Sequence, residues 1–178
     1  IVHNSVLCQL VSLSKAKDDF ENLKKYLDEQ KSILEDYIRK NPTMEEAFQD
    51  PLIFNELYYA YYYLEMNQPH PAFEHLQKGA KYLTPHTYFM YRVLYYDAYA
   101  LYYRRCKEYD KALSQLDSTI VLLQEAFSSD YVNQLSAKAD ILVEAGRSQE
   151  ALPIYEKVLQ MKDSLVTELS DKQMKLIQ

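Results

Sequence analysis

Glycine is almost absent from this sequence, which holds 2 glycines and 6 prolines among 178 residues. The tight turns of an all-β protein depend on these two residue types, so their scarcity argues against a strand-rich fold. Because the glycines stand alone at Gly79 and Gly146, the chain has no glycine-rich phosphate loop and no dinucleotide fingerprint. The sequence therefore predicts a few long helices.

Basic charge and long apolar runs are also missing. The formal net charge is −6 and the pI is about 5.3, whereas a protein that binds nucleic acid directly carries a basic footprint. No apolar run reaches the roughly 18 residues of a membrane span, so we expect none in this stretch. The chain begins at Ile1 without a signal peptide, which is typical of an excised piece or of a mature form whose leader has been removed.

Catalytic and metal-binding signatures are lacking as well. Cys8 and Cys106 have no CxxC spacing, and we expect no disulfide between them. His70 and His75 are five residues apart, so on one helix they would diverge instead of sharing a face. No serine or cysteine has a recognisable histidine partner. We therefore expect no catalytic, cofactor-binding or metal-binding residue, and no enzyme.

Apolar residues make up 48% of the chain and recur at helical spacing, enough for a continuous core. Residues 43–46 have the pattern of a capping box, and the segment 43–49 that contains them fits a short turn. The predicted helices cover 3–13, 17–40, 51–66, 69–83, 86–106, 109–126, 129–145 and 148–176.

Several of these boundaries depend on single residues. Asp50-Pro51 and Thr84-Pro85 each place a capping side chain before a proline at the first helical position. Gly146 is suited to a left-handed C-terminal cap.

A repeat of small residues is the strongest pattern. The residues Ala60, Ala100 and Ala139 are 40 and 39 positions apart, and a second series follows each of them by 12 positions, at Ala72, Ala112 and Ala151. Small residues on two consecutive helices allow those helices to approach closely, as in a helical hairpin.

The residues around these alanines resemble the tetratricopeptide repeat (TPR) family, whose pattern is W-x2-L-G-x2-Y followed by A-x3-F. The matching positions are Glu56, Tyr59, Ala60, Tyr63, Ala72 and Leu76, then Tyr96, Tyr99, Ala100, Tyr103, Ala112 and Leu116, then Leu135, Lys138, Ala139, Leu142, Ala151 and Tyr155. Glu56 and Lys138 depart from the pattern because these positions are usually apolar. The resemblance implies an all-α, right-handed α-solenoid.

The same resemblance divides the chain into three parts. Residues 51–163 would hold three TPR-like repeats, at about 53–84, 93–124 and 132–163. Residues 1–50 would form N-terminal helices, with Ala16-x3-Phe20 marking a degenerate first repeat. Residues 164–178 would form a C-terminal helix extension or connector.

The C-terminal segment from Tyr155 to Leu165 resembles the end of TPR sensor regions in Bacteroidetes membrane-bound regulators and histidine kinases. That resemblance implies a location on the periplasmic side, with a membrane span attached C-terminally. A cytoplasmic location is the alternative.

In TPR solenoids the first helix of each hairpin lines a concave surface that binds a partner. Carried over by position, this surface would consist of Phe54, Leu57, Tyr61 and Leu64, then Leu94, Asp97, Leu101, Arg104 and Arg105, then Asn133, Ser136, Asp140 and Val143. The N-terminal helices could instead fill it. Two adjacent arginines in an acidic protein are suited to gripping a carboxylate, unless they pair with Glu65, Glu108 or Glu144. The basic clamp of TPR co-chaperones is absent.

The sequence thus favours a module that binds a protein or peptide, as the sensory or interaction part of a larger bacterial signalling regulator. The alternative is a freestanding cytosolic TPR scaffold or adaptor.

Overall fold

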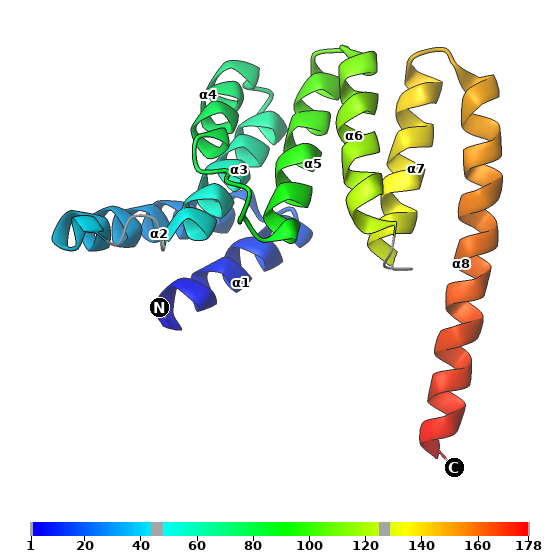
Figure 1. Cartoon of the computed structure of the whole chain (residues 1–178), viewed down its shortest axis with the longest axis horizontal. Helices are drawn as coiled ribbons and strands as arrows, with labels where there is room; N and C mark the ends of the chain where they lie inside the picture. Colours follow the sequence, from blue (N-terminus) through cyan, green and yellow to red (C-terminus); the bar gives the residue numbers. More distant parts are fainter. Residues whose placement is uncertain (1, 44–47, 125–128, 178) are drawn as a thin grey trace. The chain divides into compact units, whose positions relative to one another are not determined.

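The computed structural model of the chain describes residues 2–43, 48–124 and 129–177, and within these ranges the side chains of residues 4 to 164. The regular structure of these ranges is all-α, with no strand, as the sequence predicts (Figure 1). In chain order the helices are α1 (Val2–Ala16), α2 (Phe20–Lys40), α3 (Gln49–Glu65), α4 (Pro69–Ala80), α5 (Phe89–Arg105), α6 (Tyr109–Leu123), α7 (Ser129–Glu144) and α8 (Ser148–Ile177). Every predicted helix end lies within three residues of the observed one.

Two of the predicted N-terminal caps, at Asp50 and Thr84, are wrong. Helix α3 begins at Gln49, so Asp50 and Pro51 lie inside its first turn and Asp50 is not the cap. Helix α5 begins only at Phe89 because the preceding residues, from Thr84 to Thr87, form a turn of their own. The Thr84 backbone N–H donates to Thr87 Oγ1 at 2.8 Å, which fixes a separate turn before the helix. The predicted capping box at 43–46 lies largely outside the described residues.

The turns after α1, α3, α5 and α7 share one backbone conformation. The second residue beyond each helix has a left-handed φ: 54° at Asp18, 55° at Asn67, 60° at Lys107 and 76° at Gly146. At three turns the next residue donates its N–H to the carbonyl five residues earlier, at 2.8 to 2.9 Å. This is the Schellman arrangement, which satisfies the last carbonyls of a helix.

The buried positions keep a constant distance from these turns. The residues seven before and five after each left-handed residue are all buried, and they are Val11 and Leu23, Ala60 and Ala72, Ala100 and Ala112, and Ala139 and Ala151. The first helix pair therefore has the register of the later ones. The prediction that Ala16-x3-Phe20 marks this register is wrong, since Ala16 ends α1 and larger residues occupy the alanine positions.

The chain divides into two compact units, Ile1–Cys106 and Lys107–Gln178, here called unit 1 and unit 2. In unit 1, α1 packs against α2 and α3 against α4, while α3 also contacts α2 and α5 (Figure 1). One apolar cluster there joins Val11, Leu23 and Leu27 to Phe54 and Tyr59. A second cluster surrounds Ala60 on the other side of α3.

In unit 2, α7 packs against both α6 and α8. Its core contains Val132, Leu135 and Val158, with Ile120 and Ile154 against them. Across the described part of both units, no helix is both long and apolar enough to cross a membrane.

Candidate functional site

Three of the residues predicted to line a partner-binding surface are buried. Phe54, Leu57 and Leu64 are 9%, 1% and 2% exposed, so the prediction that they are open to a partner is wrong. Phe54 packs in the cluster that α1 and α2 share with α3. Leu57 faces α4 so closely that a β-carbon at Gly79 would lie 3.2 Å from Leu57 Cδ2. These side chains fill the spaces between helices, which helical periodicity alone does not reveal.

The predicted residues of α7 lie in unit 2. Asn133 and Asp140 are exposed, and Ser136 is half-buried. The Tyr155 hydroxyl donates to Asp140 Oδ1 at 2.6 Å, so this carboxylate already has a partner on α8. Val143 is 45% exposed.

The structure does bring together several predicted residues on the first helices of unit 1. Here the "first-helix surface" means Lys15 of α1, Tyr61 and Glu65 of α3, and Asp97, Leu101 and Arg105, which follow at four-residue steps on one face of α5. The Lys15 ammonium stands 4.3 Å from the centre of the Tyr61 ring, a cation–π contact between α1 and α3. Helix α1 therefore adds a residue to this surface that sequence reasoning missed. On α5, Leu94, Leu101 and Arg104 are half-buried.

Opposite charges balance on the first-helix surface. Burial lowers the pKa of Lys15, and the nearby Asp97 and Glu65 carboxylates act against that decrease. Burial also raises the pKa of the Tyr61 phenol, with Glu65 acting in the same direction. An aromatic ring beside both signs of charge can receive a peptide segment that has an apolar side chain and a charged group.

The predicted arginine pair is already engaged within the chain. Arg105 donates from one terminal nitrogen to both Glu65 carboxylate oxygens, at 3.0 and 3.1 Å. This is one of the pairings that the sequence left open. Arg104 also has an interaction inside the chain. A ligand carboxylate would therefore compete with Glu65 for Arg105.

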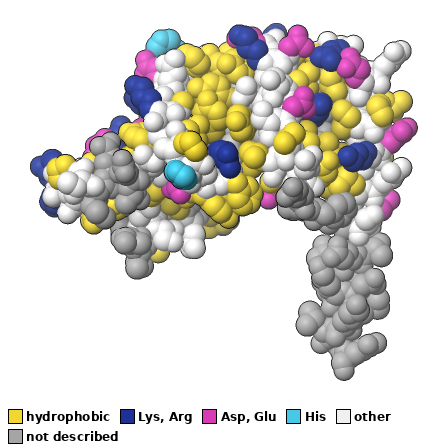
Figure 2. Space-filling model, in the orientation of Figure 1, with side chains coloured by type: hydrophobic (Ala, Val, Ile, Leu, Met, Phe, Trp, Pro, Cys, Tyr) yellow, Lys and Arg dark blue, Asp and Glu magenta, His cyan; other side chains and the backbone are white. Residues whose placement is uncertain are grey.

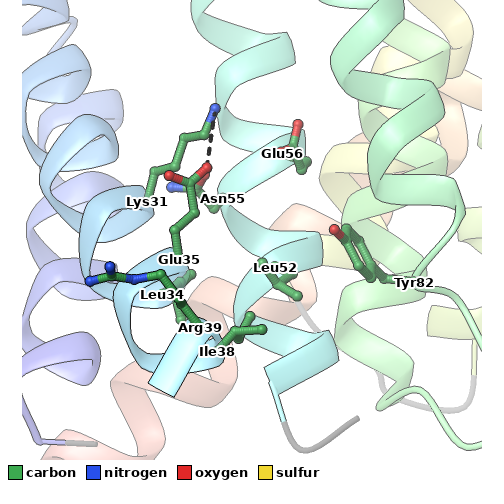
Figure 3. A pocket seen from close by; sticks show the side chains of 9 residues that line it. All are labelled: Lys31, Leu34, Glu35, Ile38, Arg39, Leu52, Asn55, Glu56 and Tyr82. Atoms are coloured by element: carbon green, nitrogen blue, oxygen red, sulfur yellow. Dashed lines mark ion pairs between the residues drawn. The ribbon is translucent and has the colours of Figure 1, made fainter. Parts of the chain in front are cut away.

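A pocket of about 330 Å³ lies between α2 and α3 in unit 1 (Figure 3). Figure 3 shows side chains of α2 along one side and side chains of α3 along the other, with Tyr82 beyond α3. Its apolar lining consists of Leu34, Ile38 and Leu52, and its polar lining includes Lys31, Asn55, Glu56 and Tyr82. No sequence pattern predicted a pocket at this place.

The two departures from the repeat pattern have structural partners. Glu56 Oε2 lies 2.6 Å from His75 Nδ1, and both side chains are only 11% exposed. Rings of Tyr59 and Tyr63 stack against the His75 imidazole, at 4.8 and 5.3 Å between centroids. These contacts explain why a carboxylate is tolerated where an apolar residue is usual.

Lys138, the other departure, lies in unit 2. Its ammonium is 2.5 Å from Asp117 Oδ1 on α6. The ion pair keeps the charged head at the edge of the helix packing, while the aliphatic stem can lie along it.

Aromatic side chains are prominent on the surface of unit 1. Figure 2 shows broad hydrophobic areas, tyrosines included, over the region of α3 to α5. Tyr88, Phe89 and Met90 at the start of α5 are 55%, 39% and 38% exposed. Exposed aromatic groups of this kind are common at sites that bind other proteins.

No family model, curated protein or solved structure matches the chain. In the part of the chain that the structure describes, no three histidine, cysteine or acidic side chains gather as metal ligands. The function must therefore be inferred from the residues and their geometry.

Proposed function

We propose that the chain is a protein- or peptide-binding module of TPR-like repeats, and that it is the sensory or interaction part of a larger bacterial signalling regulator. The observation that carries this proposal is the constant register of turns and buried positions along the chain. The left-handed residues Asn67, Lys107 and Gly146 are 40 and 39 residues apart, like the alanines beside them. Helical repeats of this kind present extended surfaces to partners.

The first-helix surface is the part of unit 1 best suited to a partner. Tyr61 offers a half-buried ring, and Leu101 occupies the same position relative to its turn as Tyr61 does. An apolar side chain of the ligand would cover these two residues. An acidic group of the ligand would displace Glu65 from Arg105, whose exposed guanidinium forms two charge-assisted bonds at once. The ligand we propose is therefore an acidic or C-terminal peptide segment.

The long last helix supports the regulator part of the proposal. Helix α8 runs for 30 residues, from Ser148 to Ile177, with Pro153 inside its second turn. A continuous helix of this length can transmit a change in the repeats to a neighbouring domain. Fractionation of cells that produce the native protein tests the location: we expect it with membranes, while a cytosolic pool would favour a freestanding scaffold.

Site-specific photo-crosslinking tests whether the first-helix surface binds a partner. A photoreactive phenylalanine derivative replaces Tyr61 or Leu101 in the native protein, and its matched control replaces the exposed Gln77 on α4. We expect the same crosslinked partner at both test positions and none at Gln77. No adduct, or equal adducts at all three positions, would exclude this surface as the binding site.

A further inference from the structure

The pocket between α2 and α3 is lined by two polar side chains that are almost wholly buried. As whole residues, Asn55 is 2% exposed and Glu56 is 9% exposed, and both come from the middle of α3. Buried polar groups normally have all their hydrogen-bonding capacity satisfied, because an unmet donor or acceptor costs free energy. Their bonds therefore show which atoms remain for a ligand.

Each of these side chains has one oxygen left as an acceptor. The Asn55 amide nitrogen donates to the Leu27 carbonyl at 3.0 Å and to Gln30 Oε1 at 2.9 Å, so only Asn55 Oδ1 remains. Glu56 uses Oε2 for His75, which leaves Oε1.

Among the described residues, the single polar side-chain atom that is both sealed from solvent and unpartnered is Arg92 Nε. The two oxygens are therefore not sealed. Since both residues line the pocket, they present acceptors to it.

The other side of the pocket offers a positive charge. The Lys31 ammonium is 3.8 Å from Glu35 Oε1, a long ion pair on an exposed helix face (Figure 3). Such a pair contributes little to stability, so a ligand carboxylate can compete for Lys31. Arg39 is held by Asp36 at 2.5 Å and is less available. Leu34, Ile38 and Leu52 supply the apolar part of the lining.

The pocket thus combines two acceptor oxygens, one from the Asn55 amide and one from the Glu56 carboxylate, with the Lys31 ammonium and an apolar wall. Its volume is suited to a small molecule. We propose that it binds a free α-amino acid with an aliphatic side chain. The ligand ammonium donates to Asn55 and Glu56, its carboxylate meets Lys31, and its side chain contacts Leu34, Ile38 and Leu52. This inference is independent of the partner-binding surface on α1, α3 and α5.

Calorimetric titration of the full chain with L-leucine tests the proposal. We expect saturable binding, and binding weaker by about tenfold or more for 4-methylpentanoate, which lacks the ammonium, and for 3-methylbutylamine, which lacks the carboxylate. The dipeptide Leu-Gly distinguishes a free amino acid from a peptide terminus. Binding of Leu-Gly as tight as that of leucine, equal binding of all the probes, or no leucine binding would overturn the proposal.

Two variants locate the site. Lys31→Gln lies on the surface and should fold normally. It should weaken the binding of leucine by about tenfold and leave the binding of 3-methylbutylamine unchanged. Lys25→Gln, on an exposed position of the same helix, is the matched control and should change neither. Glu56→Gln should weaken both ligands, with circular dichroism confirming the fold. Unchanged leucine binding in Lys31→Gln would show that the pocket is not the site.

Discussion

At the turns after α1, α3, α5 and α7 one residue adopts a left-handed backbone, and glycine occupies this position only at Gly146. Asp and Asn tolerate such a conformation because their short polar side chains can bond locally, whereas lysine gains nothing comparable. The structure leaves room around Gly146, since a β-carbon there would meet no atom within 4 Å. A substitution at this residue therefore changes backbone strain without a clash.

Gly146→Ala should lower the free energy of unfolding by about 1–2 kcal/mol, because alanine resists φ near 76°. Lys107→Gly should raise it by about 0.5–1 kcal/mol, as relief of strain exceeds the added chain entropy. Urea denaturation followed by circular dichroism measures both. Gly146→Asn is the control and should cost less than alanine. Equal losses for Asn and Ala, or none for either, would mean that these turns do not hold the left-handed conformation.

At the scale of the helices, sequence patterns predicted the existence and ends of the elements well. Proline positions, capping residues and apolar spacing act within a few residues of the chain, so their effect on helix ends does not depend on which helices pack together. The register of the first pair was missed because Val11 and Leu23 occupy the positions of the later alanines. The burial of Leu57 and Leu64 was also missed, since it depends on which helices pack against α3. For the same reason, the pocket at Asn55 and Glu56 could not be found from spacing.

The close packing of α3 gives a test at this scale. Ala60 is fully buried next to Leu57 and Leu76, so Ala60→Leu should destabilise unit 1 by about 1–3 kcal/mol through overpacking. Ala16→Leu, at the exposed end of α1, is the matched control and should change stability by less than about 0.5 kcal/mol. Thermal and urea unfolding would measure both variants. A neutral result for Ala60→Leu would show that the small residue is not needed for the approach of the helices.

At the scale of the molecule, tyrosine dominates the aromatic composition, with 18 tyrosines and no tryptophan. Burial raises the pKa of several tyrosines in unit 1, and these are Tyr58, Tyr59, Tyr61, Tyr91, Tyr95 and Tyr99. Tyr59 also donates its hydroxyl to Asp28 Oδ1, which disfavours the phenolate further. The packing of α3 and α5 thus depends on neutral phenols.

We therefore expect unit 1 to unfold at alkaline pH. Because the folded pKa values lie above the unfolded value of about 10, the stabilisation is complete below that pH and is lost as pH rises through the folded values. Phenolate absorbance and helical circular dichroism, followed in one titration, should change together above about pH 10. Full ionisation of all tyrosines near that pH with helicity intact would contradict the burial of these side chains.

The affinity of the crosslinked partner for variants of the first-helix surface tests the proposed function most directly. Tyr61→Ala and Arg105→Ala should each weaken binding by about tenfold or more, because one removes the aromatic contact and the other the carboxylate grip. Tyr37→Ala, at an exposed tyrosine of α2, is the control and should bind like the wild type. Wild-type affinity in both Tyr61→Ala and Arg105→Ala, with the fold intact by circular dichroism, would contradict a partner-binding role for this surface.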